Sequence, residues 1–410
     1  MGKRTQNLVK LAYKHLPRNY APPDDFVIEK GSGCYFKDVD GNTYLDMLAC
    51  YSAANAGYGN KEVIKAVLRQ ITEKSIICNA NCFWEEQKIL FARDLAKFCG
   101  DFISPVLDVV LPMNSGAEAV ETALKIARKW SYIRKVITPD RAEIICCENN
   151  FHGRTLGVIS MSTVAQYKEH FGPLIPGIKT VPFSDISALN AAINHGTAAF
   201  LVEPVQGEGG VIIPPYGYLA EAKKICSESN VLFILDEIQS GFGRTGKMFA
   251  CNYDNVVPDM IILGKALGGG FPISAVVGKY DIMRILEPGD HGSTFGGNPL
   301  VCAAARASLR FMRRYRPDRR AAELGFYFKN KLKEIARQSP YIKELRIIGL
   351  WVGIEVHHDG PMAHEFCQQL YKKGILCKET REYTVRMSPP LTITKKELDF
   401  ALEKIKKVFT

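Results

Sequence analysis

A lysine between an apolar run and a glycine cluster is the first residue of this 410-residue chain that could do chemistry. Lys265 stands in the segment Ile261–Gly270 (IILGKALGGG). Lysines mostly lie on solvated faces, whereas an amine removed from water has a lowered pKa and becomes a nucleophile that can form a Schiff base. The glycines leave room for a flat ligand to approach the backbone. A surface lysine at a strand end is the plainer alternative, and this segment alone does not decide between the two.

An aspartate directly after a second apolar run supplies an acidic group for the same site. Asp236 follows the run Val231–Leu235 (VLFIL). A carboxylate in that position can pair with a protonated pyridine nitrogen, which keeps a bound ring an electron sink. Capping of a helix or a turn is the alternative use. Asp236 and Lys265 end neighbouring strand candidates, so a ring would fit between them, and the pair favours a ligand site more strongly than either residue alone.

A helix that opens with small residues is the third candidate feature. Ser115, Gly116 and Ala117 begin a helical run that reaches Trp130, after the short apolar strand 108–112. Free backbone N–H groups and the helix dipole at such a start bind phosphate, and the short side chains keep the access open. An ordinary serine N-cap is the alternative, and such caps are common.

The segment Asn150–Thr155 (NFHGRT) adds an aromatic and a basic side chain. Phe151 could stack on the face of a ring, and Arg154 could form paired hydrogen bonds with a carboxylate. His152 between them has no second histidine nearby in the sequence, and a lone histidine is usually structural.

Two further patterns resemble ligand sites but lack the required context. Gly241–Gly246 reads GxGxxG, yet the dinucleotide fingerprint needs these glycines to join a strand to a helix, and residues 247–258 show no helical pattern. Cys78 and Cys82 are spaced CxxxC, which is not a zinc spacing. We therefore expect no nicotinamide site and no metal, and mostly reduced thiols among the twelve cysteines.

Apolar runs alternate with helical stretches before Pro299. Strand-like runs occupy residues 108–112, 142–147, 198–203, 231–235 and 260–263. This alternation predicts a doubly wound, parallel α/β sheet, whose ligands lie at the carboxyl ends of the strands. The candidate residues obey that rule, since each of four comes at or just after a strand end: Ser115, Glu203, Asp236 and Lys265.

Three regions follow from the pattern. Residues 1–50 hold an arm and a hairpin around Asp40-Gly41, a strong turn signal, and we expect them to pack with the C-terminal region. Residues 51–299 are predicted to form a large ligand-binding domain. From Leu300 onward long helices and short strands replace the alternation, so residues 300–410 predict a smaller α+β domain.

The composition excludes several classes of protein. Apolar residues make up 47% and charged residues 23%, as in ordinary globular proteins, and no run approaches the ~18 apolar residues of a membrane span. The net charge of +10 is typical of a solvated basic surface, with steering of anionic substrates as the sharper alternative. The basic run Arg313–Arg320 has no recognised nucleic-acid-binding module beside it, so we expect no nucleic-acid partner.

Six motifs in fixed order carry a family resemblance. They are SGAEA, FHGRT, VEPVQGEGG, LDEIQSGFGRTG, GKALGGGFPISAV and HGSTFGGNPL. From about Tyr20 to the C-terminus the chain resembles the class III aminotransferases. The resemblance implies fold type I of the enzymes dependent on pyridoxal 5'-phosphate (PLP), with a mostly parallel seven-stranded sheet in the large domain and a smaller α+β domain. It also implies transaminase activity with PLP as cofactor.

The resemblance assigns a role to each cofactor residue by its motif. Lys265 matches the lysine that carries PLP and moves the proton, and Asp236 matches the partner of the pyridine nitrogen. Gln239 matches the residue near the ring hydroxyl, and Phe151 matches the aromatic residue that stacks on the ring.

The phosphate of the cofactor is expected at the helix start and at a subunit boundary. Gly116 and Ala117 match the phosphate-binding backbone, assisted by Ser115. Thr294, in HGSTFGGNP, matches a threonine that reaches the phosphate from the partner subunit. The resemblance therefore implies an obligate homodimer with shared active sites.

The substrate residues point to the ornithine-acting branch of the family. Arg154 resembles the arginine that holds the α-carboxylate, and Tyr20 and Tyr51 resemble two tyrosines that line the ornithine pocket. Arg386 resembles the arginine that binds 2-oxoglutarate, and Glu208 resembles the glutamate that neutralises it. The implied reaction moves the δ-amino group of L-ornithine to 2-oxoglutarate and gives glutamate 5-semialdehyde and glutamate.

Several alternatives stay open at this stage. His152 is commoner in acetylornithine enzymes, and residues 57–61 (GYGNK) depart from the family's GHxHP pattern near Tyr51, so an aminotransferase for acetylornithine, 4-aminobutyrate or another diamine is the nearest rival. A non-catalytic protein of the same fold and a nicotinamide oxidoreductase are rivals from other classes. Only a short arm precedes Tyr20, about as much as a mature family member carries, so we expect a cytoplasmic enzyme.

Overall fold

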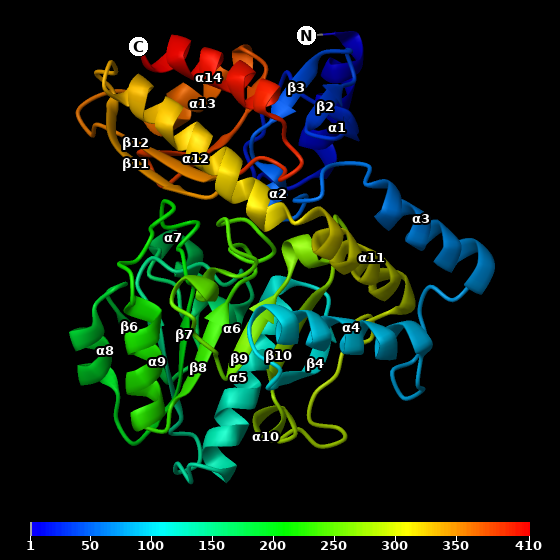
Figure 1. The fold of residues 1–410 in the computed structure, drawn as a ribbon, viewed down its shortest axis with the longest axis vertical. Helices are drawn as coiled ribbons and strands as arrows, with labels where there is room; N and C mark the ends of the chain where they lie inside the picture. Colours follow the sequence, from blue (N-terminus) through cyan, green and yellow to red (C-terminus); the bar gives the residue numbers. More distant parts are fainter. Residues whose placement is uncertain (1) are drawn as a thin grey trace.

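The computed structural model describes residues 2–410, which form two lobes joined side by side (Figure 1). A seven-stranded sheet in the order β4-β10-β9-β8-β7-β5-β6 forms the centre of the larger lobe. Its strands are β4 (Leu107–Met113), β5 (Glu143–Cys147), β6 (Ile178–Val181), β7 (Thr197–Val202), β8 (Leu232–Asp236), β9 (Met260–Leu263) and β10 (Ser274–Lys279). Only β10 runs antiparallel to its neighbours β4 and β9 among these strands. The predicted mostly parallel sheet is confirmed.

Two hydrophobic cores lie on the opposite faces of this sheet. Alternate residues of a strand point to opposite faces, and β7 accordingly gives Phe200 and Val202 to one core and Ala199 and Leu201 to the other. Apolar residues on both faces explain why the strands read as continuous apolar runs.

Helices bury both faces of the large sheet. Helix α5 (Gly116–Ile133), with the short α6 (Leu156–Ile159) and α10 (Tyr280–Met283), covers one face. The other face is covered by α4 (Glu86–Phe102), α8 (Ile186–Ala192), α9 (Tyr218–Glu228) and part of α11 (Pro299–Tyr315). The short α7 (Ala165–Lys168) lies between α6 and β6 along the chain.

Strands β6 and β10 were not among the individual strands that the apolar pattern indicated. The strand β6 (IKTV) is short and lies at the edge of the sheet, where a lysine is tolerated and the apolar signal is weak. The strand β10 directly follows the glycine-rich GKALGGGFPI, which reads as a loop from sequence.

The smaller lobe contains an antiparallel sheet in the order β11-β12-β15-β14. Its strands are β11 (Ile342–Ile348), β12 (Trp351–Val356), β15 (Thr384–Met387) and β14 (Lys378–Thr380). The helices α12 (Pro317–Ala336), α13 (Ala363–Lys372) and α14 (Lys395–Phe409) share its hydrophobic core.

The N-terminal hairpin joins this lobe. A second four-stranded sheet has the order β1 (Ile28–Ser32), β2 (Tyr35–Asp38), β3 (Thr43–Asp46) and β13 (Ile375–Leu376), and β3 pairs in parallel with β13. Cys34, Leu45 and Met47 are buried in the core of the smaller lobe. Helix α1 (Lys3–His15) and both chain ends lie on this lobe as well (Figure 1).

The chain crosses between the lobes from α11 to α12. Helix α11 packs on α4 and on α3 (Lys61–Arg69), which continues into a π-helical turn (Gln70–Lys74). Side chains of α11 from Val301 to Met312 belong to the core of the larger lobe. The division into residues 1–50, 51–299 and 300–410 stays a prediction.

The GxGxxG segment Gly241–Gly246 is a loop between the lobes and does not join a strand to a helix. Arg244, at its centre, is fully buried and donates hydrogen bonds to Ser52 Oγ at 3.0 Å and to the carbonyl oxygens of Leu350 and Pro389 at 2.9 Å each. The glycines therefore let the backbone pack closely around a buried guanidinium that ties the two lobes together.

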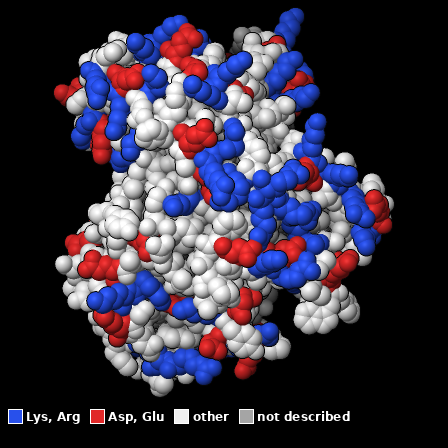
Figure 2. All heavy atoms as spheres, viewed as in Figure 1, with Lys and Arg blue, Asp and Glu red and all other residues white. Residues whose placement is uncertain are grey.

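Charge on the visible face is mixed. Figure 2 shows lysine and arginine side chains gathered over α3, α11 and α12, with acidic side chains interspersed. Within the run Arg313–Arg320, Arg313 pairs with Asp101, Arg314 with Glu62, and Arg316 with Asp318. No helix among residues 2–410 is long and apolar enough to cross a membrane.

Candidate active site

The carboxyl ends of β7 and β8, the loop after β9 and the start of α5 surround a cavity of about 200 Å³. Parallel strands bring these ends to one edge of the sheet, so residues far apart in sequence meet there. The cavity is lined by Gly116, Ala117, Phe151, His152, Gly153, Glu203, Val205, Asp236, Ile238, Gln239, Ser240 and Lys265. Seven of the thirteen residues predicted for the cofactor and substrate site therefore do not line it, and their positions are described below.

Lys265 lines this cavity from the start of a 3-10 turn (Lys265–Gly268), which one residue, Gly264, separates from β9. Its Nζ donates a hydrogen bond to Gln239 Oε1 at 3.3 Å. Burial lowers the pKa of the Lys265 amine, although the negative charges of Glu208 and Asp236 act in the opposite direction. The backbone of Lys265 has φ +45°, a region that costs a non-glycine residue free energy and is found mainly at functional sites. The amine is thus held where a neutral nucleophile is favoured.

Asp236, Lys265 and Gln239 come together because their strands are neighbours. Asp236 is the last residue of β8 and is in register with Ile262 of β9. Its Oδ1 accepts the backbone N–H of Ile238 at 3.0 Å, which fixes the carboxylate at the end of the strand. The predicted juxtaposition of Asp236 and Lys265 on adjacent strands is present in the structure.

His152 makes a contact that sequence reasoning missed. Its Nδ1 lies 2.7 Å from Asp236 Oδ2, and both side chains are buried. Burial disfavours the charged imidazole, but the hydrogen bond and charge of Asp236 and the charge of Glu203 outweigh it and raise the pKa of His152. His152 and Asp236 therefore form a buried pair in which the carboxylate favours the charged imidazole. Only the strand order β8-β7-β5 brings the loop that carries His152 to the end of β8, so no local signal could have revealed this pair.

Glu203, at the end of β7, completes this buried group. Its Oε2 accepts the backbone N–H of Phe151 at 3.0 Å and so holds the loop that carries Phe151 and His152. The position of Glu203 after an apolar strand was noticed in the sequence, but no role was assigned to it.

The burial of Glu203 predicts that the stability of the fold depends on pH. Burial raises the pKa of its carboxyl from 4.5 to about 7, against the lowering effect of His152. Between these values the folded protein keeps a proton that the unfolded chain releases, so Glu203 makes the fold less stable as the pH rises through this window. Glu203→Gln removes this effect. The difference in Tm, variant minus wild type, is expected to grow by on the order of 2–4 °C from about pH 5 to about pH 8.

Differential scanning fluorimetry in matched buffers measures this difference. Glu148→Gln, at an exposed carboxylate near the same loop, is the control for the loss of one acidic side chain. A Tm difference for Glu203→Gln that stays constant over the whole range would contradict the prediction.

The start of α5 also lines the cavity. Gly116 and Ala117 line it, and the first N–H groups of a helix have no partner within the helix. Ser115 is exposed and forms a capping box with Glu118, in which its Oγ accepts the Glu118 N–H at 3.2 Å. A Cβ on Gly153 would lie 2.7 Å from the Cβ of Ala117, so only glycine lets the FHGRT loop approach this helix.

An ion pair between a buried arginine and a partly exposed glutamate lies beside the cavity. Arg386 of β15, 1% exposed, pairs through Nη1 with Glu208 Oε1. The guanidinium carbon of Arg386 also lies 4.8 Å from the ring centre of Tyr51. The predicted partners Arg386, Glu208 and Tyr51 are thus in contact.

Tyr51 is held by an unusual left-handed turn. Residues 49–52 all have positive φ, a conformation that is costly for non-glycine residues. Asp46 stabilises this turn because its carboxylate accepts the N–H groups of Leu48 and Ala49 at 2.8 and 3.0 Å and the hydroxyl of Tyr58 at 2.7 Å. Tyr58 belongs to the segment GYGNK that departs from the family pattern, so this departure supports the strained turn under Tyr51.

Three predicted residues lie on the surface of the single chain. Tyr20 is 83% exposed. Arg154 is exposed and stacks its guanidinium 3.3 Å from the ring centre of Tyr167. Thr294 is exposed and lines a different cavity with Ala80, Asn81, Gly292 and Ser293.

Comparison with known proteins identifies the family. The sequence profile of the class III aminotransferases matches residues 16–409. The chain belongs to this family. This aminotransferase is 50% identical over 407 residues to the ornithine aminotransferase of Geobacillus sp. (strain WCH70), with 99% of each chain covered. It is 48% identical to the ornithine aminotransferase of Bacillus subtilis (strain 168), with 96% of this chain and 95% of the relative covered.

Solved structures agree with this assignment. The ornithine aminotransferase from Toxoplasma gondii ME49 superimposes with a TM-score of 0.95 at 41% identity, over 100% of this chain and 95% of the other. The acetylornithine aminotransferase from Elizabethkingia anophelis superimposes with a TM-score of 0.87 at 37% identity, over 99% of this chain and 98% of the other. The fold is therefore fold type I of the PLP enzymes, as expected, and the enzyme is a PLP-dependent transaminase.

The cavity residues fit PLP. Among residues 2–410, the buried atoms His152 Nε2 and Gln239 Nε2 have no hydrogen-bond partner, so two residues of the lining keep polar capacity for a ligand. The lining contains both an amine and the start of a helix, which match the aldehyde and the phosphate of the cofactor. No group of acidic, histidine or cysteine side chains in the described part of the chain could hold a metal ion.

Proposed function

We propose that this aminotransferase transfers the δ-amino group of L-ornithine to 2-oxoglutarate. The products are glutamate and glutamate 5-semialdehyde, which cyclises to pyrroline-5-carboxylate. The observation that carries the proposal is the ion pair of the buried Arg386 with Glu208, next to Tyr51 and beside the cavity that holds Lys265. The relatives named ornithine aminotransferase, at 47–50% identity over nearly the whole chain, support it.

Each cofactor-site residue has a role in the proposed reaction. PLP, when bound, supplies an electron sink that lets the carbon next to the transferred amine lose a proton. Lys265 holds the cofactor and, once the substrate amine displaces it, moves that proton at Nζ as general base and then acid. With PLP bound, Asp236 would pair with the protonated pyridine nitrogen, and His152, 2.7 Å from Asp236 Oδ2, holds that carboxylate in place.

The remaining cofactor residues orient the ring and its phosphate. Phe151 would stack on the ring, Gln239 would face its hydroxyl, and Gly116 and Ala117, with Ser115, would hold the phosphate. In this arrangement Lys265 alone moves protons, and these residues act by binding and orientation.

Arg386 and Glu208 let one pocket accept two different substrates in turn. Ornithine presents a cationic amine, so Glu208 must neutralise Arg386 while ornithine is bound. 2-Oxoglutarate presents a second carboxylate, which pairs with Arg386 when the Glu208 side chain turns away. Arg154 holds the α-carboxylate of ornithine, and Tyr20 and Tyr51 line its path.

An amino-donor panel with 2-oxoglutarate as acceptor tests the proposal. The expected order of kcat/KM is L-ornithine first, with N-acetylornithine and 4-aminobutyrate lower by at least about 100-fold, a ratio that needs only 2.7 kcal/mol of differential binding. Higher activity on N-acetylornithine would replace the proposed substrate by the acetylated one, which His152 and the similarity to the E. anophelis enzyme make the second candidate. A protein that retains no cofactor absorbance, even after PLP is added and the free PLP is removed, would instead be a non-catalytic protein.

We also propose a homodimer with shared active sites. Exposed aromatic side chains gather on two segments that are in contact, since Asn81 Nδ2 donates to the carbonyl oxygen of Ser293 at 2.5 Å. These side chains are Phe83, Trp84 and Phe295, with Trp84 93% exposed. Such a patch marks an association surface, and Thr294 lies within it, ready to reach the phosphate in a second copy of the chain. Sedimentation equilibrium at twice the chain mass would support the dimer, and a monomer at micromolar concentration would exclude it.

The twelve free cysteines support a reducing compartment, and we propose the cytoplasm.

A further inference from the structure

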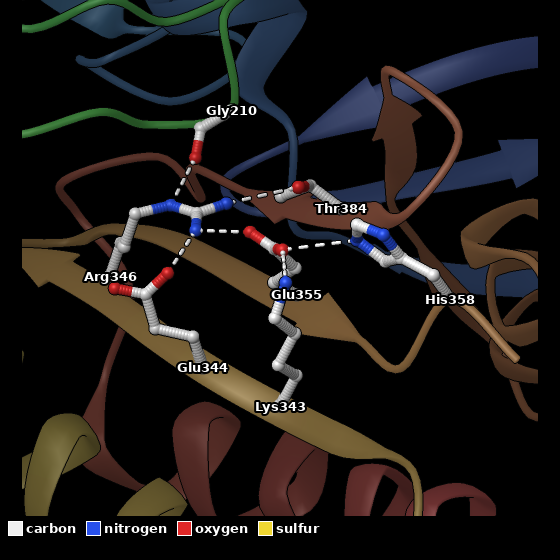
Figure 3. Close-up of polar contacts among 7 residues, drawn as sticks. All are labelled: Gly210, Lys343, Glu344, Arg346, Glu355, His358 and Thr384. Carbon is white, nitrogen blue, oxygen red and sulfur yellow. Dashed lines mark hydrogen bonds and ion pairs between the residues drawn. The ribbon is translucent and has the colours of Figure 1, made fainter.

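Arg346, on β11 of the smaller lobe, reaches across to the loop that carries Glu208. Its Nε donates to the carbonyl oxygen of Gly210 at 2.8 Å, and its Nη2 donates to Thr384 Oγ1 at 3.0 Å. Figure 3 shows the guanidinium between the Gly210 segment and the sheet, with the carboxylate of Glu355 beside it and that of Glu344 below it. A single side chain therefore bonds two elements that belong to different lobes.

Other small-lobe groups hold the same loop, which we call the Glu208 loop (residues 206–212). Thr380 Oγ1 donates to the carbonyl oxygen of Glu208 at 2.6 Å. A Cβ on Gly353 of β12 would lie 2.8 Å from the Gly210 oxygen, so the sheet packs directly against the loop. Within the loop, Gln206 and Ile212 exchange backbone hydrogen bonds of 3.1 and 3.0 Å. The backbone on both sides of Glu208 is thus fixed by contacts to the smaller lobe.

The strand that Arg346 holds through Thr384 is the strand that carries Arg386. Thr384 and Arg386 lie two positions apart on β15. In the pairing with β12, Thr384 is opposite Glu355 and Arg386 is opposite Gly353. Arg346 therefore bonds to a residue two positions from Glu208 and to a residue two positions from Arg386, namely Gly210 and Thr384. It forms no hydrogen bond with the side chain of either member of the pair.

Acidic neighbours anchor Arg346 itself. Its Nη1 pairs with Glu355 and with Glu344. Burial works against ionisation of Glu355, yet hydrogen bonds from Lys343 and Arg346 lower its pKa to about 2, so the anchor stays charged at neutral pH. Glu344 is 54% exposed at its side chain and contributes less. The planar guanidinium of Arg346 uses four of its five N–H donors to bond to Gly210, Thr384, Glu355 and Glu344. A lysine ammonium cannot reach all four acceptors at once.

We propose that Arg346 is a positioning residue that sets the substrate preference of the active site. It fixes the backbone of Glu208 relative to Arg386, so that the pair opens and closes by rotation of the Glu208 side chain alone. Without Arg346 the loop drifts, Glu208 neutralises Arg386 less well, and ornithine binding suffers. 2-Oxoglutarate binding changes little, because β15 keeps its backbone pairing with β12 and β14 and the oxoacid's own carboxylate pairs with Arg386. The inference rests on the proposed function for the identity of the two substrates.

The test measures both half-reactions of the holoenzyme by single-turnover absorbance. Arg346→Gln is expected to lower kcat/KM for L-ornithine about tenfold while kcat/KM for 2-oxoglutarate stays within about twofold. Arg346→Lys is expected to resemble Arg346→Gln, since charge alone does not hold both acceptors. Lys343→Gln is the matched control, because Lys343 also pairs with Glu355 but makes no contact with the loop, and it should leave both values unchanged. Equal losses with both substrates, or full rescue by lysine, would overturn the proposal in favour of a general structural role.

A double-mutant cycle with Glu208→Gln tests the route of the effect. Once the charge of Glu208 is removed, Arg346→Gln is expected to lower ornithine kcat/KM by less than about twofold further. Fully additive losses would mean that Arg346 acts independently of Glu208 and would reject the proposal.

Hydrogen exchange separates this inference from the choice of substrate. Amides of residues 206–212 are expected to exchange about tenfold faster in the Arg346→Gln holoenzyme and at the wild-type rate in Lys343→Gln. Unchanged exchange in Arg346→Gln would refute the positioning role. If the wild type did not use ornithine, the proposed function would fail, while exchange and the 2-oxoglutarate half-reaction would still decide the role of Arg346.

Discussion

Replacing Lys265 with alanine is expected to lower kcat for transamination by at least about 10⁴-fold, because one amine both carries the cofactor and moves the proton. The Lys265 amine lies within hydrogen-bond distance of Gln239, and the charges of Asp236 and Glu208 act on it. Among the residues that line the cavity, no second lysine could take over. Steady-state assays with ornithine and 2-oxoglutarate measure the loss.

Two controls make the Lys265 result specific. Lys247→Ala removes an exposed lysine from the same region of the chain and should leave kcat unchanged. Borohydride reduction of the wild type, followed by peptide mapping, should place the mass of the cofactor on the peptide that contains Lys265 and on no other. A Lys265→Ala protein with ordinary turnover would overturn the assignment of this cavity as the active site.

Asp236→Asn is expected to lower kcat by about 10³-fold, the scale of losing one well-placed electrostatic contact to developing charge. Asparagine keeps the shape of the side chain and can still accept the Ile238 N–H, so the fold around β8 is retained. The change removes the negative charge that holds a proton on the pyridine nitrogen. It also removes the charge that raises the pKa of His152. Both effects weaken the electron sink on which proton removal depends.

The spectrum and the kinetics of Asp236→Asn should change together. The cofactor band of the variant is expected to respond to pH differently from the wild type, since the ring nitrogen loses its anionic partner. Asp281→Asn, at an exposed aspartate, is the control and should leave both spectrum and kcat unaltered. Wild-type kcat in Asp236→Asn would show that the carboxylate does not face the ring.

Much of the fold could be predicted because the signals are local. Apolar runs bounded by polar residues located β5, β7, β8 and β9, and the Asp40-Gly41 turn located the β2–β3 hairpin. The edge strand β6 and the strand β10, which follows a glycine-rich loop, carried weaker local signals and were identified only in the structure. The number of strands in the sheet followed from the family resemblance and not from the apolar pattern.

Part of the site could be predicted for the same reason. Asp236 and Lys265 end adjacent strands, so the rule that ligands lie at the carboxyl ends of parallel strands was enough to place them together. The same rule placed Glu203 at this edge of the sheet without giving it a role, and no rule of this kind pointed to the partners of His152 or Arg346. His152 lies 84 positions from Asp236 in the sequence, and Arg346 lies 136 positions from Gly210.

The sequence by itself determined the family, the positions of five of the seven strands of the large sheet and the residues able to carry and polarise the cofactor. These properties depend on residue type and on short spacings, both of which can be read from the sequence. The tertiary structure alone decided which carboxylate His152 meets, that Asp46 supports the strained turn under Tyr51, and that Arg346 ties the Glu208 loop to the strand of Arg386. Such contacts depend on which strands lie side by side and how two lobes meet, and long-range packing sets both.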